Sequence, residues 1–382
     1  MADSRTQQRH PRHHVALPVR PGAAFETQSG LQAHWPLIYG VLVSPPGATH
    51  AGIVMHPASN FMNHYLLDPL ADRGMALLAL NSRYYGGDST LIMERVIQDL
   101  GAGVKFLREQ GYRSVSLLGN SGGAALVAFY QSQAEKLTIV DTPAGDPVDL
   151  TPEDLPPADG IALLAGHPGR AQLLTNCMDA AVVDERDPLR SDPELDIYDK
   201  RHGPPFSAEF VARVRARQRQ RSDAITAWAK ARLAQLRAIP GGPRDEAFVV
   251  HRTYGDPRFV DITLDPNDRP PGGNRGDTPQ QANLSPSNLG RFSTLTSWLS
   301  QWSMESRATG PENLRHTSVP VLQVEYGADG GVFPSDVAAW SAAGGARVQN
   351  HRIAGATHYL KGQDDKRARI ADLVADWSSA LR

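Results

Sequence analysis

Short apolar stretches alternate with segments of helical periodicity across residues 40–136, and this alternation constrains the fold more than any other feature. Residues 51–55, 75–80 and 115–118 are mostly apolar runs of strand length, which is typical of strands buried in a sheet. Before the third run, the apolar residues of 91–107 fall on one helical face. Strands that alternate with helices predict an α/β fold, with a mostly parallel central sheet flanked by helices.

The same pattern returns near the C-terminus. Residues 319–324 and 348–353 predict two strands, and residues 335–343 predict a helix. A closing helix is marked by an apolar stripe of four residues, Ile370, Val374, Trp377 and Leu381. We therefore predict that residues 16–167 and 317–382 form one α/β core.

The α/β alternation is lost after a predicted strand at 161–165, and residues 168–316 are expected to form an insertion. A long helix is predicted at 208–238, and residues 248–252 and 258–263 predict a hairpin. A further helix is indicated by an apolar stripe, Phe292, Leu295, Trp298, Leu299 and Trp302. The insertion is thus predicted to be a mainly helical cap.

Charge and cysteine content exclude several classes of protein. The 382 residues carry 39 basic and 41 acidic side chains, so nothing in the net charge of −2 favours nucleic acid or a membrane surface as a partner. No segment reaches the ~20 apolar residues of a membrane-spanning helix. Residues 1–15 are polar and are predicted to be a flexible tail. The single cysteine, Cys177, cannot form an intramolecular disulfide, so a cytoplasmic protein is expected.

The most informative segment is GNSGG at residues 119–123, which satisfies G-x-S-x-G between a predicted strand and a predicted helix. In a tight strand-to-helix turn, Gly119 and Gly123 carry no side chain that would clash. Ser121 would project at a helix N-terminus, where backbone N–H groups favour a developing anion. The pattern predicts that Ser121 is a catalytic nucleophile; the alternative is a glycine-rich turn with a bystander serine.

A serine hydroxyl needs a base to take its proton, and the base needs an acid to orient it. Asp329 directly follows the strand at 319–324, at the carboxyl end where sites of open α/β sheets are built. His358 follows the next predicted strand and precedes the closing helix. We predict that His358 is the base and Asp329 the acid, with Asp336 as the alternative acid.

An oxyanion hole needs two donors, one from the residue after the nucleophile and one from a loop after an early strand. Gly122 supplies the first. In the loop, Pro57 has no N–H, so the backbone of Ala58 is the predicted second donor, with Ser59 or Asn60 as alternatives.

Together these residues resemble the α/β-hydrolase superfamily. Four pieces match: His56-Pro57 where many members have His-Gly, GNSGG at 119–123, GAD at 327–329 and THY at 357–359. The order serine, acid, histidine is also that of the superfamily. The resemblance covers roughly residues 40–165 and 317–382, and it implies an α/β-hydrolase fold with an inserted cap. His56 is interpreted as a residue that fixes its loop, rather than as a second catalytic histidine.

The expected activity is that of a serine hydrolase without cofactor or metal, which cleaves a carboxylic ester or lactone through an acyl-enzyme intermediate. A thioesterase, an amidase or a hydrolase of carbon–carbon bonds would use the same triad, because all pass through a similar oxyanion. A non-catalytic ligand-binding protein of the same fold is the alternative from another class.

The insertion is expected to decide which small molecule is the substrate, and near-neutral charge favours an uncharged or apolar one. Trp298 and Trp302 lie on one helical stripe and are candidates to line the substrate pocket, against the alternative of plain core packing. Five arginines at alternate positions of the long helix, 213 to 221, spread around its surface. They predict a solvated face or a homodimer contact rather than nucleic-acid binding.

Overall fold

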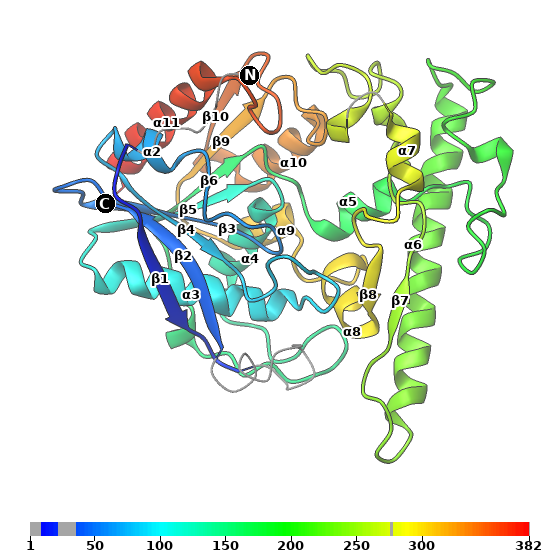
Figure 1. Cartoon of the computed structure of the whole chain (residues 1–382), viewed down its shortest axis with the longest axis horizontal. Coiled ribbons are helices and arrows are strands. Elements are labelled where there is room, and N and C mark those ends of the chain that lie inside the picture. Colours follow the sequence, from blue (N-terminus) through cyan, green and yellow to red (C-terminus); the bar gives the residue numbers. More distant parts are fainter. Residues whose placement is uncertain (1–8, 22–35, 276–277, 382) are drawn as a thin grey trace.

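The computed structural model describes residues 9–21, 36–275 and 278–381, and its central element is an eight-stranded sheet (Figure 1). The strands are β1 (His13–Pro18), β2 (Leu37–Val43), β3 (His50–His56), β4 (Ala76–Asn81), β5 (Ser114–Asn120), β6 (Gly160–Leu164), β9 (Val321–Tyr326) and β10 (Val348–Ile353). They lie in the order β1-β2-β4-β3-β5-β6-β9-β10. β2 is antiparallel to β1 and β4, and the other neighbouring pairs are parallel. The order and directions are those of the α/β-hydrolase fold.

Helices cover both faces of this sheet (Figure 1). One face packs against α2 (Leu67–Ala71) and α11 (Asp364–Ser379), and the other against α3 (Met93–Glu109), α4 (Gly123–Glu135) and α10 (Pro334–Gly344). Successive strand residues point to opposite faces, so the strands supply apolar side chains to two separate clusters. Among the described helices, none combines the length and the apolar character needed to cross a membrane.

The predicted strands of the core are confirmed, but the N-terminal tail is corrected. His13–Pro18 is an edge strand antiparallel to β2, whereas the sequence predicts a flexible tail at 1–15; residues 1–8 lie outside the described residues. Only Val15 and Leu17 of this strand face the core, and an edge strand with so few apolar residues resembles a polar tail in sequence. Just before it, Arg12 donates to both oxygens of Asp68 at 2.8 and 2.9 Å.

Between β6 and β9 the chain forms several helices and two short strands, joined by loops; that residues 168–316 form a mainly helical cap stays a prediction. The helices and strands are α5 (Arg170–Cys177), α6 (Ala208–Arg237), β7 (Ala247–Val249), α7 (Pro279–Leu284), β8 (Phe292–Thr294), α8 (Leu295–Ser297) and α9 (Gly310–Arg315). Short turns are η3 (Pro193–Leu195), η4 (Pro257–Phe259), η5 (Gly273–Arg275) and the π-helical η6 (Trp298–Trp302). α6 stands at the side of the molecule farthest from the sheet (Figure 1).

Two predictions within this segment are wrong. β7 pairs with β8 rather than with residues 258–263, which begin with the turn η4. Pro257 lacks the N–H that a paired strand needs, and the carboxylate of Asp256 accepts from the amide of Arg258, which favours a turn. The predicted helix that includes Phe292 starts only at Leu295, because the preceding three residues belong to β8.

The arginines of α6 differ in their surroundings. Arg213 and Arg219 are exposed, as predicted for a solvated face. Arg221 is buried and donates to the carboxylate of Glu185 and to the carbonyl oxygen of His251, so the prediction is wrong for this residue. A buried guanidinium with charged and carbonyl partners ties α6 to its own segment.

The segment contacts the core at the N-terminal end of α3. Ser300 donates its hydroxyl to Glu94 Oε2 at 2.7 Å and accepts from the amide of Met93 at 2.8 Å. Burial raises the pKa of Glu94 to about 7, more than the hydrogen bond from Ser300 lowers it. Glu94 Oε1 is buried without a partner among the described residues, so this carboxyl group favours its protonated form.

Candidate active site

Ser121 occupies the turn between β5 and α4, as the G-x-S-x-G pattern predicts. Its φ of 56° lies in the left-handed region, which is costly for a residue other than glycine. The turn is held from the next strand, because the amide of Ser121 donates to the carbonyl of Leu164 at 3.0 Å. Close packing explains both glycines: a Cβ on Gly119 would lie 2.6 Å from Ala124 Cα, and one on Gly123 2.4 Å from the carbonyl oxygen of Met55.

The structure brings Ser121, His358 and Asp329 into one hydrogen-bonded chain. His358 lies between β10 and α11, and its Nε2 is 2.9 Å from Ser121 Oγ. Its Nδ1 is 2.7 Å from Oδ2 of Asp329, which follows β9. The other oxygen, Asp329 Oδ1, accepts from the amides of Gly331 at 2.7 Å and Val332 at 2.9 Å. Since the carboxylate accepts from Nδ1–H, Nε2 is left to accept the proton of the serine hydroxyl.

Electrostatics favour an ionised acid beside a basic imidazole. Burial raises the pKa of Asp329, but the charge and hydrogen bond of His358, with the two backbone donors, outweigh it and lower that pKa. Burial likewise lowers the pKa of His358, but the charge and hydrogen bond of Asp329 raise it above its ordinary value. This arrangement is suited to general-base chemistry by His358.

The alternative acid, Asp336, is not in this chain of hydrogen bonds. Its Oδ2 accepts from the amide of Phe333 at 3.0 Å, at the start of α10. Burial raises its pKa to about 6. Asp336 therefore caps the first turn of α10, and Asp329 is the acid that contacts His358.

The predicted backbone donor at Ala58 is corrected by the structure. The amide of Ala58 donates to His56 Nδ1 at 3.1 Å, and the amide of Ser59 donates to the same atom at 2.9 Å. Both amides are therefore engaged, and His56 fixes its loop as expected. Gly122, the other predicted donor, lines the cavity at Ser121. Its amide makes no hydrogen bond within the described part of the chain.

A cavity of about 490 Å³ opens at Ser121 and His358. Trp302 lines it, and the guanidinium of Arg170 stacks over the Trp302 ring at 4.1 Å from its centroid; that Trp302 contacts a substrate stays a prediction. Trp298 does not line it, which corrects that prediction: this side chain is buried, and its Nε1 donates to Thr226 at 3.0 Å. Trp298 and Trp302 belong to one buried apolar cluster, as their shared helical stripe indicates, but only Trp302 also reaches the cavity.

Sequence reasoning missed two residues in the wall of this cavity, His167 and Arg170. His167 lies 5.5 Å from His358 between ring centroids, and burial, with His358, lowers its pKa to about 3. It comes three residues after β6, so the rule that sites form at the carboxyl ends of strands would have found it. Arg170 donates to Asp88, and it donates to Gln301 at 2.8 Å. Both partners are distant in sequence, so no local pattern predicts these contacts.

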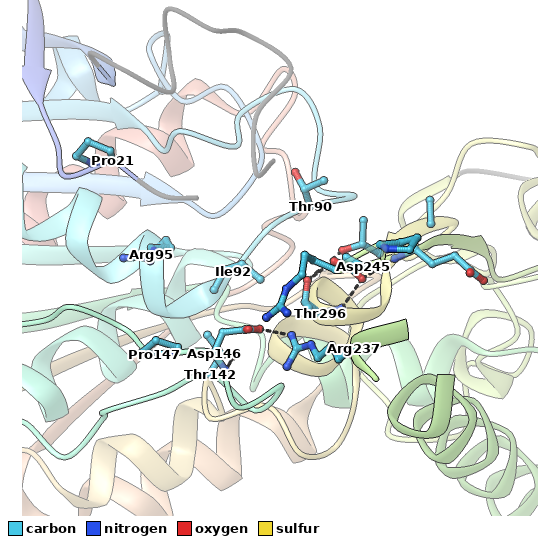
Figure 2. A pocket seen from close by; sticks show the side chains of 15 residues that line it. Pro21, Thr90, Ile92, Arg95, Thr142, Asp146, Pro147, Arg237, Asp245 and Thr296 are labelled. Carbon is cyan, nitrogen blue, oxygen red and sulfur yellow. Dashed lines mark hydrogen bonds and ion pairs between the residues drawn. The ribbon is translucent and has the colours of Figure 1, made fainter. Parts of the chain in front are cut away.

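A second cavity, of about 730 Å³, lies between the core and the inserted segment (Figure 2). Two of its acidic side chains have partners within the lining: Asp146 pairs with Arg237 at 2.6 Å, and Asp245 accepts from the hydroxyl of Thr296. It shares no lining residue with the cavity at Ser121. Within the described residues, no cluster of three or more metal-ligating side chains occurs in either place.

The chain matches no protein-family model and no curated protein sequence. Among solved structures it is similar to the esterase domain of a Rhodothermus marinus protein, with 13% identity over 96% of this chain and 98% of that one, and a TM-score of 0.47. It is also similar to a carboxyl esterase from Bacillus coagulans, with 11% identity over 96% and 98% and a TM-score of 0.46. A monoacylglycerol lipase from Paleococcus ferrophilus has 11% identity over 90% and 99%, and a TM-score of 0.45.

Proposed function

We propose that this protein is a serine hydrolase that cleaves a carboxylic ester or lactone through an acyl-enzyme intermediate. The observation that carries the proposal is the unbroken sequence of contacts from Ser121 Oγ to His358 Nε2 at 2.9 Å and from His358 Nδ1 to Asp329 Oδ2 at 2.7 Å. Nucleophile, base and acid are thereby oriented for proton transfer before substrate binds.

In the proposed mechanism, Ser121 Oγ attacks the carbonyl carbon while His358 Nε2 takes its proton. The tetrahedral oxyanion then collapses, the bond to the leaving oxygen breaks, and His358 returns the proton to that oxygen. Water, activated by the same histidine, attacks the acyl group on Ser121 and releases the acid. Asp329 stabilises the transient imidazolium and keeps its Nε2 directed at the serine.

The lining of the cavity, where polar groups lie among aromatic and aliphatic side chains, supports a small, uncharged substrate that has both apolar and hydrogen-bonding groups. The volume of about 490 Å³ is in the range of small-molecule sites. The wall includes five asparagines, Asn60, Asn63, Asn120, Asn274 and Asn288. We further propose that the inserted segment is a cap that selects the substrate, because Arg170, Leu173, Tyr254, Phe259 and Trp302 belong to it and line the cavity.

Replacement of the nucleophile tests the activity. Ser121→Ala is expected to lower kcat for p-nitrophenyl esters by several orders of magnitude and to abolish labelling by a fluorophosphonate probe. Its thermal unfolding should stay close to that of the wild type. The control is Ser379→Ala, which removes an exposed hydroxyl of α11 and should change neither readout. Ester hydrolysis retained by Ser121→Ala, or a wild type that remains unlabelled, would refute the proposal.

The bond that is cleaved is tested by a panel of esters, lactones, thioesters and anilides graded by acyl size. We expect the highest kcat/KM for small esters or lactones whose acyl group carries hydroxyl or amide groups. A clear preference for thioesters or anilides, or for long alkyl chains, would contradict the proposed substrate class while leaving the nucleophile intact.

A further inference from the structure

His56 places a ring nitrogen beside the predicted oxyanion donor. It is the last residue of β3, and it lines the cavity that contains Ser121. A Cβ added to Gly122 would lie 2.7 Å from His56 Nε2, so this nitrogen comes within contact distance of the residue that follows the nucleophile. Glycine at position 122 leaves that space open.

The hydrogen bonds of the loop determine which nitrogen of His56 carries the proton. Nδ1 accepts from two amides, those of Ala58 at 3.1 Å and Ser59 at 2.9 Å, and therefore cannot itself be protonated. Burial, together with the positive charge of Arg170, holds the pKa of His56 well below its ordinary value of 6.5. The ring is thus neutral with its proton on Nε2, and Nε2 makes no hydrogen bond within the described residues.

The backbone of the same loop offers little to an oxyanion. Pro57 has no N–H, and the next two amides, of Ala58 and Ser59, donate to the histidine. A tetrahedral oxyanion held by Gly122 alone would lack its second donor. Asn60, the remaining alternative, also lines the cavity, but the three atoms nearest to a Cβ at Gly122 all belong to the ring of His56.

We propose that the Nε2–H of His56 is the second donor of the oxyanion hole, beside the backbone N–H of Gly122. The inference rests on the proposed serine-hydrolase function. The proton stays on Nε2 throughout, because His56 stabilises the negative oxygen by a hydrogen bond and transfers nothing. The loop that usually presents a backbone amide instead presents a side chain whose tautomer its own amides have fixed.

Two substitutions separate this role from loop fixing. In His56→Asn, the side-chain oxygen lies where Nδ1 was and still accepts from the loop amides, but no atom reaches the position of Nε2. In His56→Gln, the carboxamide reaches the position of Nε2 and supplies an N–H donor, but the acceptor for the loop is lost. Each variant therefore keeps one of the two functions: His56→Asn can still fix the loop, and His56→Gln can still donate to the oxyanion. For both variants kcat, KM and thermal unfolding are measured, with Ser121→Ala as the inactive reference.

For His56→Asn we expect a fall in kcat of about 10²–10³-fold, little change in KM and a melting temperature near that of the wild type. His56→Gln should melt at a lower temperature yet retain more kcat than His56→Asn. A boronic acid, which Ser121 converts to a tetrahedral anion, should bind His56→Asn more weakly in proportion to the loss of kcat.

The opposite order of activities, with His56→Asn active and His56→Gln inactive, would show that His56 only fixes the loop and would overturn the inference. So would unchanged boronic acid affinity in His56→Asn, whatever the order. These outcomes leave the proposed function intact, provided that wild-type hydrolysis depends on Ser121. If the wild type shows no Ser121-dependent hydrolysis, both the function and the inference fall.

Discussion

Asp329→Asn exchanges one carboxylate oxygen for an amide nitrogen, and the structure dictates which one. Oδ1 accepts from two backbone amides, of Gly331 at 2.7 Å and Val332 at 2.9 Å, and only an oxygen can do this. The new NH2 group must therefore face His358 Nδ1, to which it donates. The imidazole proton then moves to Nε2, which points at Ser121 Oγ and can no longer accept its proton.

The expected loss of kcat in Asp329→Asn is large, because His358 is held as the wrong tautomer. A fall in kcat of about 10⁴-fold is expected for such a change. It corresponds to about 5 kcal/mol of transition-state stabilisation. The assay is steady-state hydrolysis of a p-nitrophenyl ester at a pH above the pKa of His358, with thermal unfolding of the same sample. The variant should remain folded, because its shape and both backbone hydrogen bonds are retained.

The matched control is Asp336→Asn. Asp336 accepts from the amide of Phe333, and an asparagine oxygen can still do so, which leaves kcat within about threefold of the wild type. A kcat of Asp329→Asn within about tenfold of the wild type would refute the reasoning, because Asp329 would then not determine the tautomer of His358.

Three further outcomes follow from the same contacts. The kcat/KM of the wild type should fall on the acid side with a midpoint above pH 6.5, because only neutral His358 is a base and Asp329 raises the pKa of His358; a midpoint below 6.5 would contradict this. Since the pKa of Glu94 is raised from 4.5 to about 7, folding loses stability as pH rises through this window. The free energy of unfolding of Glu94→Gln, measured by denaturant titration, should exceed that of the wild type by about 3 kcal/mol near pH 8 and by under about 1 kcal/mol near pH 5. Equal free energies of unfolding near pH 8 would refute the raised pKa of Glu94. Gly123→Ala, whose Cβ would lie 2.4 Å from Met55 O, should lower the free energy of unfolding by about 1–3 kcal/mol, and an unchanged melting temperature would count against that contact.

Much of the core was predictable because its strands are buried on both faces. β4 and β6 have no exposed residue, and apart from Asn81 at the end of β4 they are continuous apolar runs that sequence patterns detect. The site followed from two local rules: the turn after β5 requires glycines around Ser121, and the carboxyl ends of parallel strands meet at one edge of the sheet. Asp329 and His358 were found because each comes just after such a strand.

The rest depends on contacts that have no local signature. β7 is three residues long and pairs with β8 across more than 40 residues, so the hairpin that its neighbourhood suggested does not form. The role proposed for His56 depends on which ring nitrogen faces the loop amides, and that orientation is set only when the loop folds. Trp298 and Trp302 share a stripe, yet only packing decides that one reaches the cavity.

The pairing of β6 with β9 also bears on how the protein is made. At a translation rate of about 5–20 residues per second, β9 leaves the ribosome roughly 8–30 s after β6, and the edge of β6 has no strand to pair with in the interval. During that time the nascent chain already contains Ser121 but neither Asp329 nor His358. A truncated product would therefore carry an unactivated serine beside an open sheet edge, which makes it prone to aggregation rather than to stray hydrolysis.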